Sequence, residues 1–206
     1  MIDREVEKKY TTVAVLLHWV IASLIIANLV IGSFMESLPN ATRVLFVRTH
    51  ASFGFTILLL TVVRILWRVT HQPPPFSDQI RRWERRLASF SHACMYLMML
   101  AMPLLGWLIV SSSSKALPIT AYGMLRVPAY PYLKHLTAGP AKVALHADFV
   151  TAHATGAWIF VALITLHVGG ALKHQLQGIA EVQRMWSRKK KQTGPKRSRP
   201  KFEVHS

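Results

Sequence analysis

The sequence contains a single cysteine, Cys94, and few acidic residues: nine aspartates and glutamates stand against 25 lysines and arginines. One cysteine excludes a disulfide within the chain, so cysteine usage does not indicate a redox compartment. The first apolar stretch is too long for a signal peptide, and no small-residue cleavage site follows it. We therefore expect no removable signal.

Hydrophobic residues make up 51% of the 206 residues, and they are concentrated in four long stretches. A helix needs about 20 apolar residues to cross a bilayer, and three of the stretches reach that length. The stretches are Val13–Phe34, His50–Trp67, Phe90–Val110 and Phe149–Leu172. The sequence therefore predicts an all-α membrane protein with one domain, residues 13–175, built as an up-down bundle of four transmembrane helices.

Basic residues are distributed unevenly around these stretches. Three precede the first, five lie in the connection after the second and ten follow the fourth, whereas the two connections on the opposite side hold six. The positive-inside rule therefore places both termini in the cytoplasm. This topology accounts for the net charge of +16, so we expect no nucleic acid partner. Residues 1–12 are expected to form a cytoplasmic lead, and residues 176–206 a basic, disordered tail near anionic lipid.

Two connections carry further signals. Residues 76–87 have the composition of a short amphipathic segment on the cytoplasmic surface. The third connection, residues 111–148, is long and rich in tyrosine and proline. Tyrosine favours membrane interfaces, so this connection is expected to lie as a lid on the outer surface.

Four histidines fall at two depths of the predicted bundle. His153 and His167 are fourteen residues apart, which places both rings on one helix face, about 21 Å apart along the axis. His18 in the first helix is level with His167, and His50 at the start of the second is level with His153. Each level thus receives one imidazole from each of two helices.

Paired imidazoles in a helical bundle are suitable axial ligands for a b-type haem. Because there is no Cys-x-x-Cys-His motif, a covalently attached haem is excluded. The alternative is a chance scatter of hydrogen-bonded core histidines. Ionisable residues inside a membrane are costly and usually functional, which favours the ligand interpretation.

Glycines accompany the outer level. A flat macrocycle between helices needs neighbours without large side chains, and Gly54 and Gly156, with Gly32 and Gly106, fall near this level. Close helix packing is the alternative explanation, since small residues are common where membrane helices meet.

Three polar residues lie toward the inner level. Arg64 would bind a haem propionate through charge-assisted hydrogen bonds, or else extend its charged end to the membrane surface. His92 has no partner at its level, and His174 lies two turns after His167. Either histidine would form a hydrogen bond with a haem propionate or a quinone carbonyl, or have no special role. His146 ranks below His153 as a ligand because it precedes the apolar stretch.

These motifs resemble those of one family. They are Leu17-His18-Trp19, His50-Ala-Ser-Phe-Gly54 with Arg64 and Arg68, Ser91-His92 with Pro103 and Gly106, and His153-x13-His167 with His174. The pattern is similar to bacterial di-haem cytochrome b561, a four-helix inner-membrane protein. The match is looser in the third connection, at Tyr122-Gly123 and Pro128, and the basic tail is longer than expected.

The resemblance implies two non-covalent haem b groups with axial ligands His18, His50, His153 and His167, and electron exchange with ubiquinone. It also associates His174 with the quinone. Some members look like superoxide oxidases, so a superoxide:ubiquinone oxidoreductase activity is implied, with superoxide or a redox protein as outer donor. We expect an electron carrier of the bacterial inner membrane. The alternatives are a membrane subunit of a dehydrogenase or hydrogenase, and a colourless transporter with a histidine relay.

Overall fold

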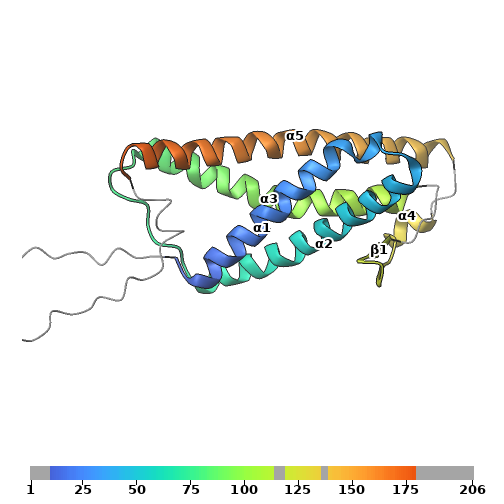
Figure 1. Cartoon of the computed structure of the whole chain (residues 1–206), viewed down its shortest axis with the longest axis horizontal. Coiled ribbons are helices and arrows are strands. Elements are labelled where there is room, and N and C mark those ends of the chain that lie inside the picture. The colour runs from blue at the N-terminus through green and yellow to red at the C-terminus, as the bar shows by residue number, and fades with distance from the viewer. Residues whose placement is uncertain (1–9, 114–118, 136–138, 180–206) are drawn as a thin grey trace, which may run out of the picture.

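The computed structural model describes residues 10–113, 119–135 and 139–179. Four long helices run alternately up and down the molecule (Figure 1). They are α1 (Thr12–Phe34), α2 (Asn40–Thr70), α3 (Arg82–Ser112) and α5 (Pro140–Leu176). All four are long and apolar enough to cross a membrane. The prediction of an all-α, four-helix membrane protein is therefore confirmed. Most of the lead and the tail lies outside the described residues.

The start of α1 and the end of α5 lie at the same end of the bundle (Figure 1). We call this the inner end, following the predicted topology, and the opposite end the outer end. Among the four long helices, α5 packs closely on α3, α3 on α2, and α2 on α1. A small core at mid-height is made by buried residues from all four. Its members are Ile21, Ile25, Ile57, Met99 and Phe160.

The helices extend beyond the predicted stretches because hydropathy marks the hydrocarbon and not the backbone hydrogen bonding. Polar residues continue α2 and α5 on the outer side, so His50 lies well inside α2 and not at its start. Glu84 caps the start of α3, because its carboxylate accepts from the backbone N–H of Arg81 at 3.3 Å. The expected surface segment at residues 76–87 is therefore wrong as a separate element, since its second half forms the first turns of α3.

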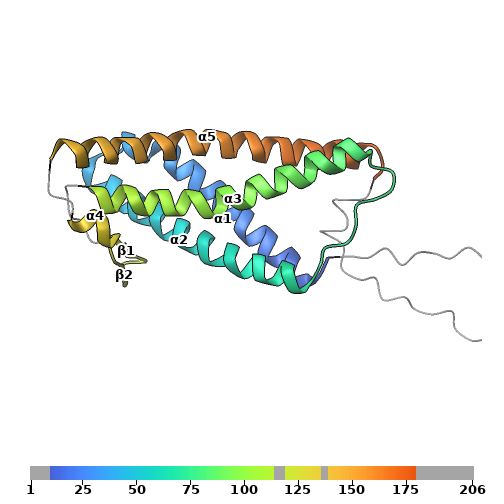
Figure 2. The same cartoon turned by 180° about the vertical axis from the view of Figure 1, so that it is seen from behind.

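The third connection is shorter and more structured than the sequence indicated. Strands β1 (Ile119–Ala121) and β2 (Leu125–Val127) pair antiparallel, with Ile119 opposite Val127. Three residues lie between the paired Ala121 and Leu125. Two of them, Tyr122 (54°) and Gly123 (72°), have positive φ, and the N–H of the third, Met124, donates to the Ala121 carbonyl at 3.2 Å. A short helix, α4 (Pro131–His135), follows. A 3-10 turn, η1 (Met35–Ser37), joins α1 to α2. Figure 2 shows the hairpin and α4 at the outer end, beside α2 and α3.

Hydrogen bonds attach this connection to the bundle. Ser52 Oγ on α2 accepts from the backbone N–H of Tyr122 at 2.9 Å, and the Tyr122 hydroxyl bonds with Thr56 Oγ1. On α3, the indole of Trp107 donates to the carbonyl of Pro128 at 2.8 Å. The hairpin is thus fixed to the two helices that frame it.

Gly156 is the tightest glycine in the described bundle. It is buried on α5, and a Cβ added there would stand 2.6 Å from Sδ of Met102 on α3. We expect Gly156→Val to lower stability by about 1–3 kcal/mol through overpacking. Thermal unfolding in detergent measures this, and adding Met102→Ala should restore part of the loss. An unchanged midpoint in the single variant would contradict close packing of α3 and α5 here.

Candidate functional site

The structure brings the four predicted histidines together in two pairs. At the outer level, His50 of α2 faces His153 of α5, with ring centres 6.0 Å apart and ring planes at 67°. At the inner level, His18 of α1 faces His167 of α5, with ring centres 6.2 Å apart and planes at 61°. We call these the outer pair and the inner pair. Both pairs share α5, as the fourteen-residue spacing predicted.

The separation within each pair fits one metal ion between the two rings. An imidazole nitrogen binds a transition metal at about 2 Å, so two rings on opposite sides of one ion have centres about 6 Å apart. Protein-only metal sites usually need three or four side-chain ligands. Within the described ranges, no group of three or more histidine, cysteine, aspartate or glutamate side chains is placed to bind a metal. Two opposed imidazoles therefore suit a metal whose other ligands come from a macrocycle.

The helix arrangement leaves room for such a macrocycle. The inner pair joins α5 to α1, and the outer pair joins α5 to α2. In the described bundle, neither α1 nor α2 is a close packing neighbour of α5, which lies against α3. An added Cβ at Gly169 or Gly170, just after His167, would meet no atom within 4 Å. The residues present thus fit a flat group held between helices.

The outer pair is held by α1 and by glycines. His50 Nδ1 lies 3.1 Å from the backbone carbonyl of Asn28 and donates to it. This bond fixes the tautomer in which Nε2 has a free lone pair for a metal. A Cβ at Gly32 would stand 3.1 Å from Cε1 of His50, and one at Gly106 would stand 3.6 Å from Cε1 of His153. Nδ1 of His153 is buried without a hydrogen-bond partner in the described structure.

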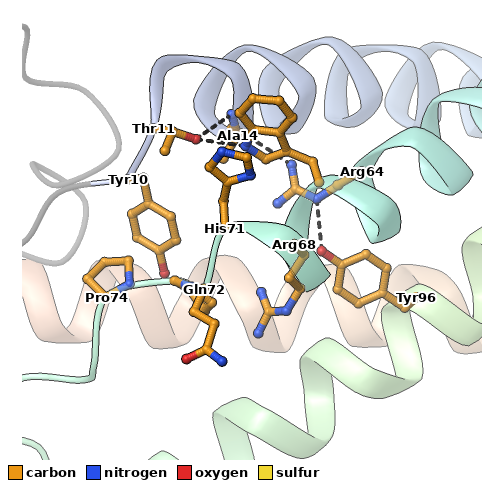
Figure 3. Close-up of a pocket in the computed structure, with 11 residues that line it drawn as sticks. Tyr10, Thr11, Ala14, Arg64, Arg68, His71, Gln72, Pro74 and Tyr96 are labelled. Carbon is orange, nitrogen blue, oxygen red and sulfur yellow. Dashed lines mark hydrogen bonds between the residues drawn. The ribbon is translucent and has the colours of Figure 1, made fainter.

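Arg64 lies beside the inner pair. Its Nη2 donates to His18 Nδ1 at 3.3 Å, its Nε to the hydroxyl of Tyr96 at 3.1 Å, and its Nη1 to the carbonyl of Ala14 at 3.2 Å. Figure 3 shows the guanidinium turned toward Ala14 and Tyr96, inside the bundle. The guanidinium thus lies between α1 and α3, and it also lines a pocket at the inner end of the bundle.

The sequence-based expectation that His92 has no partner at its level is wrong. Its ring centre lies 5.1 Å from that of His167. Because α3 begins at Arg82, His92 is almost three turns inside the helix and reaches the inner pair. The sequence carries no clear signal for this early start of α3, because a capping-box motif begins with Ser or Thr and residue 81 is an arginine.

The remaining candidates are placed as follows. His174 ends α5, and its Nδ1 is buried without a hydrogen-bond partner in the described structure. Gly54 lies near Asn28, to whose Nδ2 an added Cβ would come within 3.8 Å. Gly156 packs against Met102, which favours a helix-packing role. His146 lies in α5, but Ser112 Oγ at 3.0 Å and the carbonyl of Ile109 at 3.1 Å engage its Nδ1.

Sequence comparisons find relatives over most of the chain. Residues 9–188 match the family described as prokaryotic cytochrome b561. Cytochrome b561 homolog 2 of Escherichia coli (strain K12) is 29% identical over 170 residues, which cover 81% of this chain and 85% of that protein. Homolog 1 of the same organism is 24% identical over 185 residues, 88% of this chain and 99% of that protein.

A shorter match relates the chain to the probable superoxide oxidase CybB of Yersinia pestis. The two are 27% identical over 99 residues, 48% of this chain and 56% of that protein. The family implies a b-type haem, which agrees with the paired imidazoles. With its four membrane helices and a family match over most of its length, the chain belongs to the prokaryotic cytochrome b561 family of membrane electron-transfer proteins.

Proposed function

We propose that this protein binds two haem b groups, one between His18 and His167 and one between His50 and His153, and carries electrons between an outer donor and ubiquinone. The observation that supports this most directly is the presence of two imidazole pairs with ring centres 6.0 and 6.2 Å apart. Haem b, when bound, supplies a one-electron carrier at each level.

The protein's own residues determine which chemistry is open to such a carrier. At each level the two imidazoles would hold the metal, and the bound group would then supply electron transfer without binding oxygen or a substrate at the metal. The apolar core cluster lies between the two levels, since each of its members falls between an inner and an outer site residue of its helix. This cluster keeps water and ions out of the space between the sites. The arrangement favours outer-sphere electron transfer.

The inner end offers hydrogen-bonding groups for a quinone head group. In this proposal His174 bonds a quinone carbonyl, since its Nδ1 is buried and has no partner among the described residues. The adjacent Lys173 donates to Glu84 at 2.6 Å, which joins the end of α5 to the start of α3. That ion pair would position His174. His92 faces the inner pair and bonds a propionate.

Superoxide is the first outer donor to test, because one relative is named a probable superoxide oxidase. In the balanced reaction, two superoxide anions each lose one electron and become dioxygen. One ubiquinone takes up both electrons with two protons and becomes ubiquinol. The alternative donor is a redox protein.

The proposed location is the bacterial inner membrane with both ends of the chain in the cytoplasm. The distribution of lysine and arginine supports this orientation, because the outer side holds six and the inner side holds eighteen. Accessibility of an introduced cysteine at exposed Met124 to a membrane-impermeant reagent in intact cells would test it, after Cys94→Ser.

We expect purified protein to be red and to contain two b-type haems per chain. A reduced-minus-oxidised absorption spectrum and a haem assay per mole of protein measure this. Superoxide generated enzymatically should then reduce added ubiquinone in a protein-dependent way. A colourless protein would contradict the proposal and favour the histidine-relay alternative. A red protein whose haems are not reduced by superoxide would favour a redox protein as the outer donor.

A further inference from the structure

A positively charged pocket opens at the inner end beside the inner pair. It lies between α1, α2 and α3, and its lining includes Arg64, Arg68, Trp67 and Tyr96 (Figure 3). The guanidinium of Arg68 lies 5.8 Å from the centre of the Tyr96 ring, whose hydroxyl accepts from Arg64. The lining contains no acidic residue. Among described residues, neither arginine forms an ion pair.

The two histidine pairs differ in what faces them. At the inner pair, the Arg64 guanidinium stands at 3.3 Å from His18 Nδ1. At the outer pair, a neutral backbone carbonyl stands at 3.1 Å from His50 Nδ1. No arginine or lysine hydrogen bonds to His50 or His153 in the described part of the chain. The two sites therefore share a ligand type but not an electrostatic environment.

These neighbours act in opposite directions on a bound haem. A carbonyl that accepts from a ligand imidazole makes that ligand more basic, which stabilises the oxidised metal. A fixed cation stabilises the reduced metal, which carries one positive charge less, and the effect is strong where water is excluded. The Asn28 carbonyl therefore lowers the potential of the outer site and the Arg64 guanidinium raises that of the inner site, so both effects leave the inner site with the higher reduction potential.

Arg64 would remain near the inner site after haem binds. When Nε2 of His18 binds iron, its Nδ1 carries the proton, so Nη2 of Arg64 can no longer donate to it. The guanidinium stays attached through Tyr96 and Ala14, and its Nη2 is then available to an anion such as a propionate. The positive charge thus stays beside the site while one donor becomes free.

We propose that Arg64 and Arg68 are positioning residues that keep the inner haem at a higher reduction potential than the outer haem. An electron that enters at the outer pair is then drawn to the inner pair and on to the quinone. This inference rests on the proposed function, because it requires a haem at each pair. It adds the residues that set the direction of electron flow.

The primary test compares the two sites one at a time. His153→Ala leaves the inner pair intact, and His18→Ala leaves the outer pair intact. Spectroelectrochemical titration of each variant gives the midpoint potential of the remaining haem. We expect the higher midpoint in His153→Ala. An equal or lower midpoint there would overturn the inference while the di-haem function still holds.

The second test removes the charge. In the full chain, Arg64→Gln should lower one midpoint and leave the other unchanged, and Arg64→Lys should restore most of the difference. Arg68→Gln should cause a smaller shift because Arg68 is exposed to solvent. Arg48→Gln is the matched control, since Arg48 is exposed and close in sequence to His50; it should move neither midpoint.

The outcomes separate the inference from the function. Two haems with unmoved midpoints in Arg64→Gln would reject the role of Arg64 and leave the proposed function intact. Should Arg64→Gln lose the inner haem, an unmoved midpoint in Arg68→Gln would reject the electrostatic role. Absence of haem from the unmodified protein would reject the proposed function itself.

Discussion

Replacement of His153 by alanine is expected to reduce the haem content from two groups to one per chain. His153 is one half of the outer pair, and the opposite ring of His50 cannot fill both axial positions alone. His50→Ala should have the same effect on the same spectral component. His18→Ala and His167→Ala should instead remove the other component. Haem assays and reduced-minus-oxidised spectra of the four variants measure this.

A double variant makes the pairing test sharper. Because His50 and His153 act as one unit, His50→Ala combined with His153→Ala should retain the same single haem as either change alone. His50→Ala combined with His167→Ala should lose both. The matched control is His146→Ala, about two turns before His153 in α5, because the His146 ring is already engaged by Ser112 and Ile109. Loss of haem in that control, or retention of two haems in a single variant, would contradict the assignment.

Replacement of Gly32 by valine is expected to displace His50 and to weaken haem binding at the outer pair by about 10- to 100-fold, as for other residues that orient a metal ligand. A Cβ at this position already comes to 3.1 Å from Cε1 of His50, and the valine methyl groups reach further. Haem retention during dilution or competition with apomyoglobin measures the change. The spectral signal of the haem at the inner pair should persist.

Gly106→Ala is the control for this prediction. An added Cβ at Gly106 makes an ordinary contact of 3.6 Å with Cε1 of His153, so the outer haem should be retained. Equal loss in both variants would point to general disruption of helix packing and not to a displaced His50 ring. Normal haem content in Gly32→Val would show that the His50 ring tolerates the added side chain.

The pairing of histidines was predictable from sequence because the rise and turn of a helix are fixed. The spacing of fourteen positions from His153 to His167 set both depths, and the alternation of helix direction set the partners. Helix ends were less predictable: Asn40, Arg82 and Pro140 begin helices in polar segments where hydropathy gives no signal. The position of His92 was missed as a direct result.

Other features depend on side-chain geometry that no pattern in the sequence encodes. The three hydrogen bonds of Arg64 join it to Ala14 and His18 on α1 and to Tyr96 on α3, all far from Arg64 in the chain. The hairpin after α3 was missed because its strands are only three residues long and show no clear alternation. Its Tyr122-Gly123 turn was noted only as a match in sequence.

The contribution of α5 to both pairs has a consequence for biogenesis. Ribosomes complete this helix after the other three, and it carries His153 and His167. A nascent chain that still lacks α5 presents His50 and His18 without their paired imidazoles, so neither of the two proposed haems is expected to bind during the earlier insertion steps. Chains truncated before Pro140 should therefore emerge from translation colourless, and holoprotein maturation should await release of the full bundle from the translocon.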